Sequence, residues 1–317
     1  MVDGPGPQPG GSLAPAPTRL VAEATAPTTL VASSSRPAGA RNPWPRRIAY
    51  LILIAYALLM FIPFIWSLVT SFKTLPDSVR LTFIPDPFTL DGYNFVFNEL
   101  EPSLPRLFFN SGLIAAVVTL TNVVLGSIAG YAFARLRFPG REAIFLVVLA
   151  TLMIPDQLRL VPVYLILNAI GFTKGVLQYA GVMLVLAISA SSIFLLRQYF
   201  LSIPRELEEA ARIDGAGFFR TFRSVMLPLA GPALAAVAIL QFQGTWNGYF
   251  WPYVLLQEPD QLTVPVALGY FRLAGGLATN WPPLMALVVL ATVPVLILYL
   301  FFQRYFVEGI AASGVKG

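Results

Sequence analysis

The side chains that most often carry out chemistry in enzymes are scarce in this sequence. Its 317 residues include no His and no Cys, which removes the commonest general base, the thiolate nucleophile and the commonest metal ligands. The pattern GxxxxGK[ST], which binds nucleotide phosphates, is also missing. The sequence therefore argues against an enzyme, and any use of ATP would need another subunit.

Carboxylates are concentrated in one short stretch, residues 206–214, with the sequence ELEEAARID. The pattern predicts a short amphipathic helix whose narrow apolar stripe consists of Leu207, Ala210, Ala211 and Ile213. A helix of this length is marginal alone in water, so the stripe must pack against something. The helix could lie on a membrane surface. Helices at lipid interfaces, however, typically present Trp, Phe and Leu, whereas the small alanines of this stripe allow close approach to a protein surface. We therefore favour docking to a partner.

Residues on either side of this helix mark its predicted start and end. Pro204 suits its first position, where a missing N–H costs nothing, and the early glutamates suit the positive end of the helix dipole. Asp214 and Gly215 predict its end, because glycine accepts the left-handed conformation of a helix cap. A second short helix is expected over 218–226, ending before Pro228.

A second group of polar side chains lies in the stretch QFQGTWNGYFWPY, residues 241–253. Its candidate residues for a sugar path are Gln241, Gln243, Trp246, Asn247 and Tyr249, because amides bind hydroxyls and aromatic rings stack on sugar faces. The alternative is packing and interface anchoring, the ordinary role of Trp and Tyr at the edge of a bilayer. Asp156 and Arg159, spaced i, i+3, are expected to pair with each other rather than to couple ions.

Composition places these groups in a membrane protein. Hydrophobic residues make up 56% of the chain and charged residues 12%, against roughly a quarter charged in soluble domains. Spans need about 20 apolar residues. Six segments qualify: 48–71, 108–134, 143–165 (interrupted by Pro155 and Pro162), 179–196, 229–255 and 283–303. In the second span, Gly126 and Gly130 form a GxxxG pattern that favours close helix packing, although chance in an Ala/Gly-rich span is the alternative.

The distribution of basic residues predicts the orientation. With the N-terminus in the cytoplasm, 15 of the 21 Lys and Arg residues fall on the cytoplasmic side. Both termini and the 206–232 loop are then cytoplasmic. Residues 1–43, rich in Pro, Ala, Gly, Ser and Thr, are expected to be a disordered cytoplasmic tail, and residues 44–317 the transmembrane domain.

The charged loop carries a family resemblance. Glu209-Ala210-Ala211 followed by Asp214-Gly215-Ala216, and then by Phe222 and Leu227-Pro228, resembles the EAA loop of inner-membrane permease subunits of binding-protein-dependent ABC importers. Five further segments are similar to the sugar-type branch, the maltose-transporter G-subunit-like permeases: 110–141, 153–166, 194–217, 246–256 and 302–317. The resemblance covers about residues 45–317.

The resemblance implies an all-α integral membrane protein with six transmembrane helices in the type I ABC importer permease fold, its core at about 105–305. The loop would supply a cytoplasmic coupling helix between the fourth and fifth spans. Glu209 would pair with a basic residue of an ATPase, Ala210 and Ala211 would allow close packing, and Gly215 would allow the turn. The implied partners are a sister permease forming a heterodimer, two ATPase subunits that bind ATP and Mg, an extracytoplasmic solute-binding protein, and the lipid bilayer.

The expected function is to form half of the pore of an ATP-driven importer for a sugar or related solute, in the bacterial inner membrane. The chain is expected to bind no cofactor, metal or nucleic acid itself. Glycerol-phosphate importers belong to the same branch and remain an alternative, as does a permease for a polyamine, amino acid or phosphate. A secondary carrier or channel would instead transport alone without ATP, and a membrane enzyme lacks convergent catalytic groups in the sequence.

Overall fold

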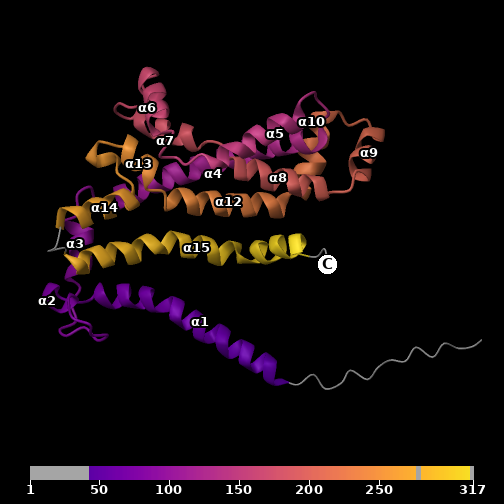
Figure 1. Cartoon of the computed structure of the whole chain (residues 1–317). Coiled ribbons are helices and arrows are strands. Elements are labelled where there is room, and N and C mark those ends of the chain that lie inside the picture. The colour runs from indigo at the N-terminus through magenta and orange to yellow at the C-terminus, as the bar shows by residue number, and fades with distance from the viewer. Residues whose placement is uncertain (1–42, 276–279, 315–317) are drawn as a thin grey trace, which may run out of the picture. The chain divides into compact units, whose positions relative to one another are not determined.

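The described part of the chain, residues 43–275 and 280–314, forms helices and no strand in the computed structural model (Figure 1). Side chains are described for residues 46–272 and 280–302. The chain divides into two compact units, residues 1–55 and 56–317. The predicted disordered tail lies almost wholly outside the described residues.

The helices follow in chain order. They are α1 (Pro43–Thr70), α2 (Leu75–Ser78), α3 (Asp91–Asn98), α4 (Leu104–Arg135), α5 (Arg141–Ala150), α6 (Leu160–Ala169), α7 (Leu177–Leu186), α8 (Ala190–Ser202), α9 (Glu206–Ile213), α10 (Phe218–Thr221), α11 (Leu227–Leu229), α12 (Gly231–Trp246), α13 (Phe250–Leu255), α14 (Val264–Gly275) and α15 (Trp281–Gly314). Short 3₁₀ turns occur at Thr151–Met153 and Pro259–Gln261, and a π-helical turn at Phe222–Met226.

The apolar helices confirm an all-α membrane protein. Within the described residues, three helices are long and apolar enough to cross a bilayer: Arg46–Thr70, Leu104–Arg135 and Trp281–Phe302. Two bent pairs also qualify if each is one span, α7 with α8 at 44° and the 218–229 segment with α12 at 74°. This gives three to five spans by length and composition, and the expected count of six is not reproduced.

The predicted third span, 143–165, is not one helix. Helix α5 ends at Ala150, and α6 begins only at Leu160. The break follows from Pro155, which has no N–H and disfavours helical geometry in the residue before it. Ile154 is accordingly extended, with φ −93° and ψ 110°. Pro162 is tolerated because it lies in the first turn of α6, where its missing N–H costs nothing.

The predicted fifth span, 229–255, is also divided. Helix α12 ends at Trp246, and α13 starts at Phe250 after a short break. The short helix predicted for 218–226 instead continues through Pro228 to Leu229, by way of the π-helical turn. A widened turn leaves a backbone carbonyl without its usual donor, so the missing N–H of the proline removes no further bond there.

Helices α4, α8 and α12 pack together, and small residues bring α4 close to α8. A Cβ atom added to Gly130 would lie 2.9 Å from the Leu196 Cβ atom and 3.0 Å from the Arg197 backbone nitrogen. One added to Gly126 would lie 3.2 Å from the Ser192 Cβ atom. The predicted packing role of the GxxxG pattern is therefore confirmed.

Candidate functional site

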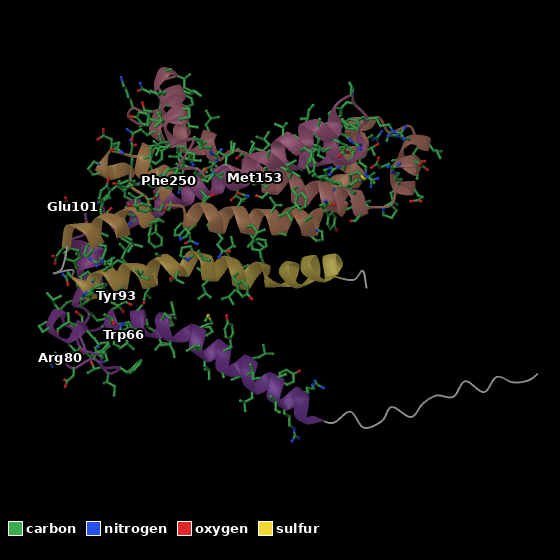
Figure 2. All side chains as sticks on the ribbon, viewed as in Figure 1. Trp66, Arg80, Tyr93, Glu101, Met153 and Phe250 are labelled. Atoms are coloured by element: carbon green, nitrogen blue, oxygen red, sulfur yellow. The ribbon has the colours of Figure 1, made fainter. Side chains whose placement is uncertain are left out.

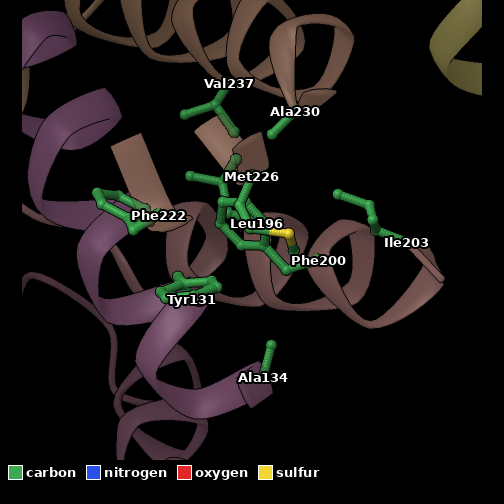
Figure 3. Close-up of a cluster of buried hydrophobic side chains, with 9 residues drawn as sticks. All are labelled: Tyr131, Ala134, Leu196, Phe200, Ile203, Phe222, Met226, Ala230 and Val237. Carbon is green, nitrogen blue, oxygen red and sulfur yellow. The ribbon is translucent and has the colours of Figure 1, made fainter. Parts of the chain in front are cut away.

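Helix α9 lies against the π-helical turn Phe222–Met226, which contributes Phe222 and Met226 to a buried apolar cluster. Figure 3 shows this cluster, in which side chains from α4 and α8 meet others from the 222–237 segment. The Tyr131 ring lies 4.9 Å from the Phe222 ring and 5.5 Å from the Phe200 ring, between ring centroids. Phe200 and Met226 are fully buried. The cluster joins both flanks of the charged loop to the spans.

A buried ion pair connects α9 to the end of α4. The Arg135 Nε atom lies 3.0 Å from the Glu208 Oε1 atom, and the two side chains are 5% and 8% exposed. The Arg135 guanidinium also donates to the backbone carbonyls of Phe200 and Ile203, at the end of α8. One arginine therefore ties the last residue of α4, the end of α8 and the first turn of α9 together.

The helix begins at Glu206, two residues after the predicted start at Pro204, because Arg205 supplies the first helical carbonyl. Pro204 lies before the helix instead of in its first turn.

The predicted apolar stripe does not all face the protein. Ala211 is 9% exposed and packs inward beside Glu208. Ala210, Glu209 and Leu207 are exposed, and Ile213 is 86% exposed. The inward face is thus formed by Glu208 and Ala211, and α9 leaves a mixed apolar and acidic face uncovered in this chain.

The turn after α9 has the predicted geometry. Gly215 adopts the left-handed conformation, with φ +80°. The backbone N–H of Gly215 donates to Arg212, and that of Ala216 donates to Ala211 at 2.9 Å, which satisfies carbonyls left free at the helix end. Asp214 is the exposed cap residue. A residue with a Cβ atom would strain this turn, so the glycine prediction is confirmed.

A second candidate site is a polar cavity of about 370 Å³ where α7 and α8 meet the end of α12. Phe250, which is labelled in Figure 2, lies in its wall. Predicted residues Gln241 and Tyr249 both line it, with Ser189. Asp156 and Arg159 also line it and form the predicted ion pair, with the Arg159 Nε atom 2.9 Å from Asp156 Oδ1.

Hydrogen bonds hold the break between α7 and α8 beside this cavity. The fully buried Asn122 amide donates to the Leu186 carbonyl at 2.8 Å, and its oxygen accepts from the Ser189 N–H at 2.8 Å. The Gln241 amide donates to the hydroxyls of Ser189 and Ser192, each at 2.9 Å. Gln241 therefore links α12 to the unwound segment.

The other residues predicted for a translocation path are dispersed. Gln243 and Asn247 are exposed and lie outside the lining of this cavity. Trp246 is 3% exposed, stacks on Phe242 and donates its indole N–H to the Ala291 carbonyl at 3.1 Å. Its surroundings fit the alternative of packing.

Comparisons with known proteins identify the chain. The family described as binding-protein-dependent transport system inner membrane component matches residues 122–311, a range that contains α9 and the residues that line the polar cavity. The chain belongs to this family. It is a transport permease and not an enzyme.

The permease is similar in sequence to characterised members. It is 37% identical over 276 residues to an arabinooligosaccharides transport system permease protein of Halalkalibacterium halodurans, covering 85% of this chain and 97% of the relative. It is 31% identical over 280 residues to an sn-glycerol-3-phosphate transport system permease protein of Brucella abortus, covering 86% and 98%.

A solved structure supports the fold. A chain of a bacterial ABC transporter involved in import of the acidic polysaccharide alginate superposes with a TM-score of 0.72 at 27% identity, covering 84% of the permease and 98% of that chain. A second alginate transporter structure, in complex with an alginate pentasaccharide-bound periplasmic protein, matches with a TM-score of 0.61 at 15% identity and bears on the fold alone. The permease therefore has the fold of an ABC importer permease.

Sequence reasoning missed two residues that organise these sites in the permease. Arg135 was counted only as a cytoplasmic charge, and Asn122 was read as part of an apolar span. A polar side chain inside a span was the available signal for Asn122, because such groups are costly in lipid unless they are paired.

Proposed function

We propose that this permease is driven by a separate ATPase subunit that binds the exposed face of α9. The observation that carries the proposal is the division of α9 into two faces. Its inner face is locked by the buried Arg135–Glu208 pair, whereas Glu209, Ala210 and Ile213 are left uncovered. The exposed apolar side chain of Ile213 and the exposed carboxylate of Glu209, on a helix held by a buried ion pair, suit a protein partner that carries a basic residue.

The contacts that hold α9 explain how its movement would reach the pore. When the ATPase closes on ATP, a partner holding α9 would displace it as a rigid body. The Arg135–Glu208 pair and the cluster of Figure 3 would pass that displacement to α4 and α8, and so to the bend beside the polar cavity. This is a two-state element biased by a ligand held elsewhere. ATP and Mg are assigned to the ATPase, because this sequence lacks the phosphate-binding loop pattern.

The same proposal includes the rest of the assembly. A sister permease would complete the pore as a heterodimer, two ATPase subunits would occupy the side of α9, and an extracytoplasmic binding protein would deliver the solute on the other side. The excess of Lys and Arg on the side of α9 supports a cytoplasmic position for this loop and for both termini. The family description supports the binding-protein partner.

For the solute, we favour an uncharged sugar or oligosaccharide. Gln241, Tyr249 and Ser189 in the polar cavity offer hydroxyl-binding groups and an aromatic ring, and the two charged residues of its lining, Asp156 and Arg159, pair with each other. The arabinooligosaccharide relative supports this choice. The glycerol-phosphate relative keeps that anion as the second candidate, for which a free cation in the cavity would be expected.

The test is a charge reversal on α9. Glu209→Lys should abolish uptake and lower stimulation of the ATPase by the loaded binding protein in the reconstituted importer, because it places like charges at the contact. Glu99→Lys is the matched control, since Glu99 is also exposed but lies at the end of α3. Normal uptake by the assembled Glu209→Lys importer would contradict the proposal. Ligand screening of the binding protein that copurifies with the permease would identify the solute.

A further inference from the structure

An arginine-rich cavity lies beside α9, and its lining includes Glu209 from the exposed face of that helix. It has a volume of about 440 Å³ and is bounded by α9 and the 134–141 segment. Five arginines and two glutamates contribute to its lining. A second, open hollow, lined by residues 137–143 and Arg205, shares Arg137, Arg141 and Arg205 with it. Of these arginines, the proposed transport mechanism uses only Arg135.

Two of the five arginines are already neutralised. Arg135 is paired with Glu208, and the Arg141 guanidinium lies 2.7 Å from Glu142 and donates to the Leu136 carbonyl at 3.1 Å. These contacts hold the walls in place.

Three arginines of the lining remain. Arg137, Arg205 and Arg212 make no ion pair within the part of the chain that the structure describes, and one carboxylate of the lining, Glu209, is left to offset them. Concentrated guanidinium groups that lack an internal anion are suited to an external one, and their planar donors match phosphate oxygens.

The position of the cavity favours a phosphate carried by a lipid. Helix α4 is a candidate span that ends at Arg135, and α5 begins at Arg141, so the cavity lies beside the ends of two apolar helices. Helix α5 starts at the rim and presents exposed apolar side chains, with Ile144 48%, Leu146 64% and Val147 66% exposed. Acyl chains could lie along this surface while the phosphate enters the cavity.

We propose that this cavity binds the phosphate of an anionic phospholipid. Arg137 and Arg205 would be its main ligands, and the exposed apolar side chains of α5 would contact an acyl chain. Anionic lipids attract basic groups at the membrane surface, and a cavity that also contacts the acyl chain selects the lipid over a free anion. The bound lipid would brace the segment between α4 and α5 against α9.

The experiment measures lipid binding to the full-length chain in a non-ionic detergent by native mass spectrometry, with phosphatidylglycerol and phosphatidylcholine as the probes. The wild type should prefer phosphatidylglycerol. The Arg137→Gln/Arg205→Gln variant should lose about tenfold or more of that affinity. The control, Arg80→Gln/Lys174→Gln, removes the same charge from two exposed positions elsewhere and should bind normally (Arg80 is labelled in Figure 2).

Two further arms separate the lipid from other anions. Ile144→Ser should weaken phosphatidylglycerol binding, because it removes part of the apolar surface that contacts the acyl chain. Inorganic phosphate should fail to displace the lipid. The proposal is overturned if both charge variants lose affinity equally, if neither does, or if inorganic phosphate at comparable concentration displaces the lipid. Unchanged thermal unfolding of the variants establishes that the comparison concerns binding.

Discussion

Replacing Glu208 by Ala would leave the buried Arg135 guanidinium without its carboxylate. The two side chains are 5% and 8% exposed, and the atoms of the pair are 3.0 Å apart. Breaking a buried pair by removing one partner costs about 3–5 kcal/mol. The cost here should be smaller, about 2–3 kcal/mol, because Arg135 keeps the backbone carbonyls of Phe200 and Ile203 as acceptors.

The loss should appear first as local opening of α9, since the pair connects this eight-residue helix to α4. Hydrogen exchange followed by mass spectrometry would detect it in the peptide that covers 206–217. With 2–3 kcal/mol lost, exchange there should accelerate by roughly 30- to 150-fold. Glu208→Gln, which keeps a hydrogen-bond acceptor, should give an intermediate rate.

Glu206→Ala is the matched control, because Glu206 lies on the same helix but is exposed. Its exchange should change by no more than about twofold, as for an ordinary surface substitution. Equal exchange in the wild type and in Glu208→Ala would refute the anchoring role of the pair. So would equal acceleration in the two Ala variants, which would indicate a general loss of helix stability.

Three further predictions concern packing, the bent helix and pH. Gly130→Ala should cost about 1–3 kcal/mol of stability through overpacking and so lower the unfolding midpoint in detergent, because its Cβ atom would meet the backbone of α8. Gly112→Ala on the same helix is the control, because its Cβ atom would meet nothing within 4 Å and the midpoint should not fall. Asn122→Ala should cost about 3 kcal/mol and lower the midpoint by roughly 5–10 °C, because it strands buried backbone groups at the α7–α8 break. The hydrogen bond from Arg141 lowers the pKa of Glu142 below its usual value of 4.5, so this contribution to stability is present above about pH 4.5 and is lost as the pH falls through the lowered pKa. Glu142→Gln should lack that acid-dependent step in a series of melting curves, and an identical step in the variant would contradict the assignment.

Some features were predictable from the sequence because their causes are local. Gly215 adopts its predicted left-handed turn, and Asp156 and Arg159, one helical turn apart, form their predicted pair. The GxxxG glycines pack closely for the same reason, since the lack of a side chain is a property of the residue itself.

Features that depend on distant partners were not predictable. Glu206, Glu208 and Glu209 are chemically equivalent in the sequence, and only Glu208 turns inward, because Arg135 at the end of α4 meets it there. The prediction that each span is one continuous helix failed for a related reason. Hydropathy sums apolar residues without testing whether the helix is continuous, and the α7–α8 break has no proline and depends on the hydrogen bonds of Asn122.

The most direct test of the central claim is site-specific photo-crosslinking from the exposed face of α9 in native membranes. A photoreactive residue at Ile213, which is 86% exposed, should crosslink to an ATPase subunit that mass spectrometry identifies by its phosphate-binding loop. The same probe at the exposed Phe97 on α3 should not. Crosslinks from Ile213 that reach only lipid, or that reach the ATPase no more often than those from Phe97, would contradict the proposed coupling role of α9.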